Sequence, residues 1–318
     1  MVPVSRMGIG LAAVGRPAYL TANRAEDLGA DRSVAVMRAR TFAVLDAAYA
    51  AGWRYVDVAR SYGRAEEFLA EWLAAHPAAV DVRVGSKWGY RYVGDWRLDA
   101  AVHEVKDHSL ATFTAQYAET EALLGDRLTV YHVHSATLES GALSDTGLHT
   151  ALAGLRDSGV RVGISTSGPD QAETVRRALE VRVGDAPLFT SFQATWNLLE
   201  PSAGPALAEA AATGAWVIVK EAVANGRLAP GGADSPSAER ATRIAAELDV
   251  PVDQLAIAAA LAQPWASVVL SGAVTPDQVA SNAAAESVTL PSGLLTELTS
   301  LAEEPHEYWA ARAARPWT

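Results

Sequence analysis

One pattern occurs eight times along the chain: a short run of β-branched or apolar residues, then a longer segment with helical spacing. The strand-like runs are MGIGLA (7–12), YVDVA (55–59), DVRVGSK (81–87), LTVYHVH (128–134), VRVGIST (160–166), LFTSFQA (188–194), AWVIVK (215–220) and ASVVLSG (266–272). The helical segments that follow them span 35–51, 65–76, 110–124, 147–157, 169–181, 203–213, 238–262 and 276–285. Alternating strands and helices form parallel sheets, and eight repeats fit a closed barrel better than an open sheet. The sequence therefore predicts the α/β class, as a (β/α)8 TIM barrel.

No linker rich in Pro, Gly or Ser divides the 318 residues, so residues 1–318 are expected to form a single barrel domain. Three segments fall outside the repeat: 13–34, 88–109 and 286–318. The long loops that follow barrel strands gather at the carboxyl end of the barrel, where active sites of this fold lie. These three segments are therefore predicted to form the walls of a substrate site.

Composition excludes several classes of function. A formal net charge of −11, without any run of Lys or Arg, argues against nucleic acid as a partner. The chain has no cysteine, so it forms no disulfide and has no thiolate nucleophile. Neither a signal peptide nor a membrane span is indicated, so we expect no membrane partner and a cytoplasmic location. Both a monomer and a homo-oligomer are compatible with these features.

Four ionisable residues lie at the ends of three neighbouring strands. Asp57 and Lys87 end the second and third strands, Tyr62 lies in the loop after the second, and His134 ends the fourth. A nearby ammonium group stabilises a phenolate, so Lys87 is expected to lower the pKa of Tyr62 from its usual value near 10. Asp57 would hold Lys87 in place, and His134 would bond a substrate oxygen or share the phenolic proton. Together the four predict a proton donor that faces a carbonyl oxygen.

The segments around these residues resemble the aldo-keto reductase family. RYVDVARSYGRAEEFL (54–69) is similar to the family's Asp and Tyr-Gly pattern, VGSKWG (84–89) to its third-strand Lys, and LTVYHVHSA (128–136) to its fourth-strand His. The resemblance covers essentially the whole chain. It implies that Asp57, Tyr62, Lys87 and His134 are the catalytic tetrad, and that the barrel binds NADP(H) or NAD(H). It further implies hydride transfer between an alcohol and an aldehyde, ketone or sugar lactol, with Tyr62 as general acid/base.

The same resemblance implies positions that bind the coenzyme. VGISTSG (162–168) is similar to a Gly-x-Ser-Asn segment, with Thr166 in place of the usual Asn. Lys220 stands where the family commonly has an aromatic residue that stacks on the nicotinamide ring, and Val274 stands where NADPH-dependent members often have an Arg. Val274 favours NAD(H), whereas family membership favours NADP(H). The implied coenzyme-binding residues are Ser165, Thr166, Gln193, Lys220, Gly226, Arg227, Gly272, Gln278 and Asn282.

Aromatic and cationic residues in the long segments suggest a pocket for a polar or sugar-like substrate. The candidate substrate residues are Trp88, Tyr90, Trp96 and Trp309, with Arg16, Tyr19, Arg91 and Tyr308 nearby in the same segments. Each has an ordinary structural alternative, since buried aromatic residues contribute strongly to packing in any loop. Asp57 and Lys87 could likewise form a purely structural ion pair.

Two other functions also fit parts of the sequence. His132 and His134 form a His-x-His pair near a strand end, as in metal-dependent hydrolases with this fold, but that site would need a further ligand and would leave Lys87 and Tyr62 without a role. We therefore expect no metal and interpret His132 as a core histidine. A non-catalytic barrel that binds a nucleotide is the second alternative, and the intact tetrad argues against it.

Overall fold

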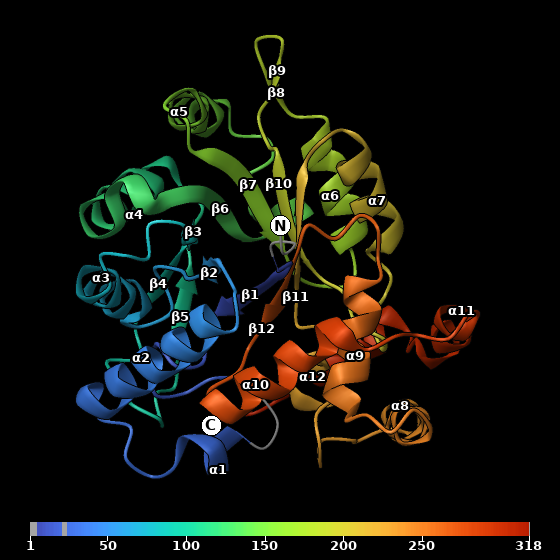
Figure 1. Ribbon diagram of the computed structural model, residues 1–318. Helices are drawn as coiled ribbons and strands as arrows, with labels where there is room; N and C mark the ends of the chain where they lie inside the picture. The colour runs from blue at the N-terminus through green and yellow to red at the C-terminus, as the bar shows by residue number, and fades with distance from the viewer. Residues whose placement is uncertain (1–4, 21–23, 318) are drawn as a thin grey trace.

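Eight parallel strands close into a barrel, as predicted (Figure 1). The computed structural model describes residues 5–20 and 24–317. Around the barrel the strands follow the order β1, β12, β11, β10, β7, β6, β3 and β2. Their bounds are β1 (Met7–Gly10), β2 (Tyr55–Asp57), β3 (Arg83–Trp88), β6 (Leu128–Ala136), β7 (Arg161–Thr166), β10 (Ser191–Thr195), β11 (Trp216–Lys220) and β12 (Val268–Ser271). Each lies within or overlaps a strand-like run of the sequence.

Helices surround the barrel and connect successive strands (Figure 1). Their starts follow local sequence signals: the side chains of Ser33, Ser109, Asp145 and Thr275 each accept a hydrogen bond from the first turn of the helix that follows. The connecting helices are α2 (Val34–Ala50), α3 (Ala65–Ala75), α4 (Leu110–Leu124), α5 (Thr146–Asp157), α6 (Gln171–Leu179), α7 (Gly204–Ala212), α8 (Pro236–Glu247), α9 (Val252–Leu261) and α10 (Pro276–Ala284).

The helical segment predicted at 238–262 is instead two helices, α8 and α9, which corrects the prediction. The break contains Asp249, whose φ of 55° lies in the left-handed region, and Pro251, which caps α9. Proline disfavours helical backbone in the residue before it, so a continuous helix cannot pass through this point at low cost.

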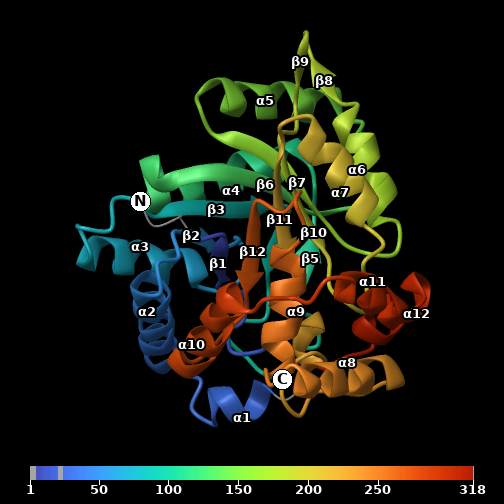
Figure 2. The same ribbon diagram turned by 45° about the vertical axis from the view of Figure 1, so that its right-hand side comes forward.

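The three long segments carry structure of their own. Segment 13–34 contains α1 (Arg24–Leu28), segment 88–109 forms a hairpin of β4 (Tyr90–Tyr92) and β5 (Glu104–Lys106), and segment 286–318 contains α11 (Leu294–Leu298) and α12 (Pro305–Ala313). Figure 2 shows a second small hairpin, β8 (Arg182–Val183) and β9 (Ala186–Pro187), at the top of the view, with α1 at the bottom and α11 and α12 at the right. Residues 1–4, 21–23 and 318, which the predicted domain and segments include, lie outside the described residues.

The barrel interior has two layers of different character. Because side chains alternate along a strand, residues two apart in β2 and in β11 face inward together. At the amino end, Tyr55, Ile218, Val268 and Leu270 form an apolar cluster, and a Cβ at Gly85 would meet the Tyr55 hydroxyl at 1.9 Å. One step toward the carboxyl end, the inward side chains become polar. Among the described residues, no helix is both long and apolar enough to cross a lipid bilayer.

Candidate active site

A buried ion pair lies at the centre of the polar layer. The Lys87 ammonium donates to Asp57 Oδ2 at 2.5 Å and to the Val58 carbonyl at 2.9 Å, and the Lys87 side chain is fully buried. Gln193 Nε2 donates to the other oxygen, Asp57 Oδ1, at 2.8 Å. Burial lowers the pKa of Lys87, and the Asp57 charge acts against that shift. Asp57 therefore holds Lys87 in position, and Gln193 holds Asp57.

The loop after β2 brings Tyr62 over this pair. Gly63 has a φ of +61°, and a Cβ there would lie 2.5 Å from the Gly15 carbonyl oxygen. Gly15 is equally constrained, since its Cβ would meet the Tyr62 carbonyl at 2.6 Å. The Arg64 N–H donates to the Gly15 carbonyl at 2.8 Å. Two glycines thus let the β1 and β2 loops touch through their backbones, and this contact positions the phenol.

Tyr62 lies between the ion pair and His134. The Tyr62 hydroxyl is 3.5 Å from His134 Nε2, and the Lys87 ammonium is 4.8 Å from the centre of the Tyr62 ring. His134 Nδ1 is 3.4 Å from Ser61 Oγ. Burial, reinforced by the positive charge of Lys87, holds the pKa of His134 well below its usual value, so the imidazole is neutral. The structure brings Asp57, Tyr62, Lys87 and His134 together in one cluster.

The protonation of Tyr62 differs from the sequence-based expectation. Burial raises the pKa of the phenol well above 10, and the Asp57 carboxylate raises it further. The net shift is therefore upward, whereas the sequence led us to expect that Lys87 would lower the pKa of Tyr62. The Arg16 charge acts to lower the pKa, but burial and the Asp57 charge outweigh it. The phenol is therefore held in its protonated form.

Arg16, which the sequence placed only in a segment near the substrate site, lies directly beside Tyr62. Its guanidinium is only 2% exposed, and it donates to the Ser61 carbonyl at 3.1 Å and to Glu104 at 2.6 Å. It also lies 5.0 Å from the centre of the Tyr62 ring and 4.8 Å from that of Trp317. The C-terminal segment thereby reaches Arg16, next to the tetrad.

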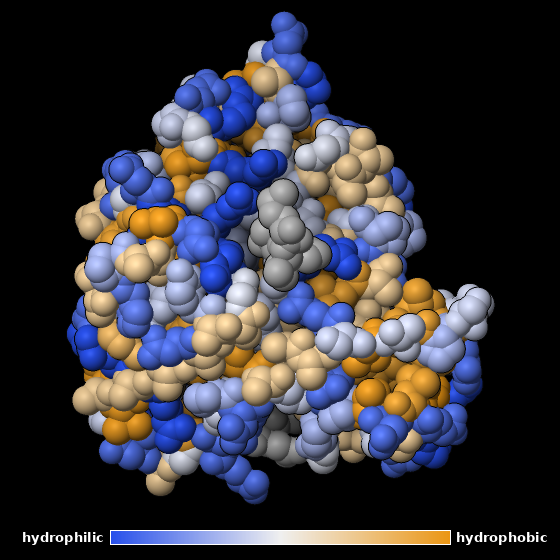
Figure 3. Space-filling model, viewed as in Figure 1, coloured by the Kyte–Doolittle hydropathy of each residue, from blue (hydrophilic) through white to orange (hydrophobic). Residues whose placement is uncertain are grey.

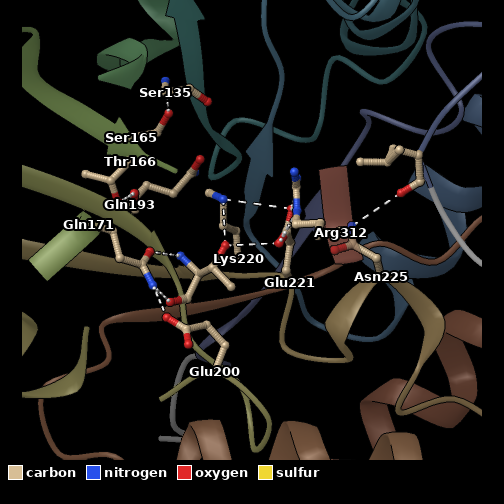
Figure 4. A network of polar contacts seen from close by, with 12 residues as sticks. Ser135, Ser165, Thr166, Gln171, Gln193, Glu200, Lys220, Glu221, Asn225 and Arg312 are labelled. Atoms are coloured by element: carbon tan, nitrogen blue, oxygen red, sulfur yellow. Dashed lines mark hydrogen bonds and ion pairs between the residues drawn. The ribbon is translucent and has the colours of Figure 1, made fainter. Parts of the chain in front are cut away.

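Polar side chains line the opposite side of the barrel mouth (Figure 4). The Lys220 ammonium donates to Thr195 Oγ1 at 2.7 Å and lies 3.9 Å from Glu221. Arg312 of α12 donates to both carboxylate oxygens of Glu221, with a closest approach of 2.5 Å. Burial lowers the pKa of Lys220 to about 8. Burial alone would raise the pKa of Glu221, but Arg312 and Lys220 outweigh it and bring the value to about 2.

Sequence reasoning missed Glu221 and Arg312, which lie 91 positions apart. Glu221 has a φ of 58°, a strained value for a residue with a side chain, and such strain collects near functional sites. It also missed Gln171, whose amide bonds Glu200 and the backbone of Thr195 below the mouth (Figure 4). A buried Gln at the start of a helix gives no signal in a single sequence.

Three of the coenzyme residues predicted at the nicotinamide end already make hydrogen bonds within the protein: Ser165, Thr166 and Gln193. Ser165 lies close to the tetrad, where its hydroxyl accepts the Ser135 N–H at 2.8 Å (Figure 4). Thr166 is fully buried, with its hydroxyl 3.5 Å from the Gln193 carbonyl. Gln193 is bonded to Asp57 and so supports the tetrad directly.

Several of the residues predicted at the phosphate and adenosine end are also bonded to other side chains of the protein. Arg227 is bonded to Asp234 and to both oxygens of Glu303, so its charge is already paired. Gly226 adopts a φ of 95°, in the region that favours glycine. Asn282 is bonded to Ser271 and Asp253. Gln278 accepts the Val274 N–H at 2.9 Å and donates to Asp27 at 2.8 Å.

A nicotinamide dinucleotide needs polar partners along its length, and the mouth offers them. Asn225, in the ANGRL segment that resembles the pyrophosphate loop, has a buried Oδ1 without a hydrogen-bond partner among the described residues. The residues present therefore fit this group.

Of the predicted substrate residues, Trp88 does not face the barrel mouth, so this part of the prediction is wrong. It is fully buried, with its ring 5.1 Å from that of Phe113 on α4. Because Lys87 faces into the barrel, its neighbour Trp88 must face out toward the helices. Trp96 also lies outside the mouth, where its indole donates to the Arg32 carbonyl and its ring contacts Phe68 of α3.

Two predicted substrate residues do lie at the mouth. The Tyr90 ring is 5.0 Å from that of His134, and burial raises the pKa of its hydroxyl to about 12. The Trp309 ring is 5.8 Å from the Lys220 ammonium and 5.2 Å from the Arg312 guanidinium. The hairpin β4/β5 and α12 thus each contribute one aromatic wall.

His132 lies one step deeper than His134. It pairs in register with Lys87, and its Nε2 is 2.9 Å from Ser191 Oγ. Burial, with the Lys87 charge adding to it, holds its pKa well below the usual value. In the part of the chain that the structure describes, no group of three or more His, Cys, Asp or Glu residues could hold a metal ion.

Comparisons with known proteins identify the family. The family model described as Aldo/keto reductase family matches residues 27–303. A D-threo-aldose 1-dehydrogenase from a Pseudomonas species is 28% identical over 287 residues, which cover 81% of this chain and 86% of that protein. The holo form of an aldo-keto reductase from Bacillus halodurans superposes with a TM-score of 0.69 at 23% identity, covering 95% of this chain and 93% of that one. The chain belongs to the aldo/keto reductase family and is an NAD(P)-dependent oxidoreductase.

Proposed function

We propose that this oxidoreductase interconverts a carbonyl compound and an alcohol, with Tyr62 as the general acid/base. The observation that carries the proposal is the convergence of a phenol, a neutral imidazole and a buried ion pair. Tyr62 Oη lies 3.5 Å from His134 Nε2, with Lys87 and Asp57 beneath it. A carbonyl oxygen at this point could accept hydrogen bonds from the phenol and from the imidazole.

In the direction of reduction, Tyr62 donates its proton to the substrate oxygen as negative charge develops there. The raised pKa keeps that proton on the phenol until it is needed. Lys87, held by Asp57, and Arg16 place positive charge next to the phenolate that forms. In the direction of oxidation, the same groups stabilise the phenolate that removes the proton from the alcohol.

When bound, the nicotinamide coenzyme supplies or accepts the hydride. Ser165 and Lys220 would hold its nicotinamide end, Asn225 its pyrophosphate, and Gln278 its adenosine, following the family resemblance. Lys220 replaces the usual aromatic residue and offers a charged contact in place of a stacked ring. Its pKa of about 8 leaves most of the Lys220 population charged at neutral pH.

For the coenzyme, we favour NAD(H) over NADP(H). The position that often carries an Arg for the 2′-phosphate is Val274, which is buried. The neighbouring Gln278 is bonded to the carboxylate of Asp27, and a second negative charge near that carboxylate is unfavourable. Fluorescence titration with NADH and NADPH tests this preference. Tighter binding of NADPH would show that another residue of the chain binds the phosphate.

The substrate we propose is a sugar lactol or another polar carbonyl compound. The mouth combines the aromatic walls Tyr90 and Trp309 with the charged pair Lys220 and Glu221, a combination suited to hydroxyl-rich molecules. The 28% identical relative acts, by its name, on D-threo-aldoses. This likeness supports the same substrate class here.

A coenzyme-linked assay tests the function. The protein is incubated with NAD⁺ or NADP⁺ and a panel of free aldoses, and reduced coenzyme is measured by absorbance. A matched panel of simple alkanols, and of alkanals with reduced coenzyme, serves as the comparison. We expect turnover of at least one aldose to exceed that of every simple substrate. Efficient turnover of alkanals alone would refute the substrate class, and no turnover of any alcohol or carbonyl would refute the reaction.

A further inference from the structure

A second cavity lies at the end of the barrel opposite the tetrad. It has a volume of about 810 Å³ and is lined by the starts of β3, β7 and β11 together with the loops that precede them. Figure 3 shows strongly hydrophilic side chains gathered below the β8/β9 hairpin at this face of the molecule. Small-molecule sites commonly have volumes of about 300 to 1,000 Å³, so this cavity is large enough for a metabolite.

The lining is strongly positive in an otherwise acidic protein. Four arginines contribute to it, Arg83, Arg156, Arg161 and Arg182, and its lining contains no Asp or Glu. This concentration is notable because the chain as a whole carries 37 acidic and 26 basic residues. The charge of the cavity is therefore opposite in sign to that of the protein.

The arginines are incompletely paired. Arg83 is exposed, and its guanidinium has no hydrogen-bond or ion-pair partner among the described residues. Arg161 donates to the Thr190 carbonyl at 3.3 Å and lies 5.6 Å from the centre of the Trp216 ring. Arg182 donates to the backbone of the β8/β9 turn. Among these four arginines, the ion pairs of the described residues include one, between Arg156 and the exposed Asp157 at 2.9 Å.

Helix ends at this face do not cancel the charge. The carboxyl ends of α5, α6 and α7 border the cavity through Gly159, Leu179 and Thr213. A helix end of this kind carries about −0.5 of an elementary charge, so three of them contribute about −1.5. These helix ends therefore offset only part of the positive charge of the four guanidinium groups of the lining.

We propose that this cavity binds a phosphorylated small molecule of nucleotide size, at a site separate from the active site. Arg83 and Arg161 provide the phosphate contacts, since guanidinium groups pair with phosphate oxygens through two hydrogen bonds. Trp216, which is half-buried, and Phe189 provide apolar wall for the rest of the ligand. The cavity volume exceeds what inorganic phosphate alone would fill, which favours a larger phosphomonoester.

Isothermal titration calorimetry with AMP tests the site. The protein is first saturated with NADH, which carries no phosphomonoester, so that AMP cannot occupy the coenzyme site. Adenosine serves as the uncharged probe and inorganic phosphate as the small anion. We expect AMP to bind more tightly than either, with an affinity that falls as salt is raised.

Two substitutions and a matched control locate the binding. The double variant Arg83→Gln/Arg161→Gln is expected to weaken AMP binding by at least about tenfold, equivalent to the loss of one charge-assisted contact. Arg243→Gln removes an exposed arginine of α8 and should leave the affinity unchanged. The proposal is overturned if AMP does not bind, if adenosine binds equally well, or if the double variant binds AMP like the wild type. Because the measurement is binding and not turnover, its result is independent of the proposed reaction.

Discussion

The two inward-facing layers of the barrel interior differ sharply, although the same strands build both. In β2, Tyr55 belongs to the apolar cluster and Asp57 to the tetrad, and in β11 the corresponding pair is Ile218 and Lys220. The apolar layer has no charge to satisfy and stabilises the barrel by excluding water. The polar layer consists of buried charges that are tolerated because each is paired. Residues two positions apart on the same strand thus serve stability in one layer and the proposed chemistry in the other.

The largest expected effect comes from breaking the central ion pair. Lys87→Met leaves the Asp57 carboxylate buried with Gln193 as its remaining side-chain partner, which should lower the free energy of unfolding by about 3–5 kcal/mol. Adding Asp57→Asn removes the unpaired charge and should restore most of that loss without restoring turnover. Urea denaturation and the aldose assay on both variants measure the two effects. If the double variant regains activity, Lys87 has no part in the reaction.

A substitution in the apolar layer should lower the stability of the protein without lowering its turnover. Ile218→Ala removes a fully buried side chain from the amino-end cluster, at a cost of about 2–5 kcal/mol in the free energy of unfolding. Turnover per folded molecule should stay near the wild-type value, because the substitution leaves the polar layer, which includes Lys220, unchanged. Turnover measured below the unfolding transition checks this, and a loss comparable to that of Lys87→Met would remove the distinction between the layers.

Lowering the pH should have a smaller effect on stability, through the protonation of Glu221 at the barrel mouth. The pKa of Glu221 is about 2 in the folded protein and near 4.5 when unfolded, so its stabilising contribution is complete above pH 4.5 and is lost as the pH falls toward 2. Between pH 5 and pH 3 this group should account for about 2 kcal/mol of lost stability. Glu221→Gln should lose correspondingly less over that range in urea denaturation. Equal losses in the two proteins would mean that Arg312 does not hold Glu221 in solution.

Much of the fold, and the convergence of the four ionisable residues, could be predicted from the sequence because local signals determine them. Eight alternating runs identified the barrel, and the spacing of Asp57, Tyr62, Lys87 and His134 along three strands placed them at one end. Trp88 could not be placed in this way, because the direction of a strand residue depends on which neighbour faces inward. The same holds for the protonation of Tyr62, which depends on burial and on the nearby Asp57 charge.

Contacts between distant segments also escaped the sequence. Arg312 reaches Glu221 from α12, and Gln193 reaches Asp57 across the barrel, 136 positions away. Nothing local in either stretch of sequence indicates its partner. These contacts arise from barrel closure, which brings strand ends together irrespective of their order in the chain.

The most direct test of the account is the separation of coenzyme binding from turnover in Tyr62→Phe. The substitution removes only the hydroxyl, so the dissociation constant for the coenzyme should stay within about twofold of the wild type, while turnover should fall by about 10² to 10⁴. Tyr117→Phe, which removes an exposed hydroxyl bonded to Glu121 on α4, is the matched control and should keep full turnover. A Tyr62→Phe variant that binds coenzyme and turns over aldose at the wild-type rate would contradict the assignment of Tyr62 as the proton donor.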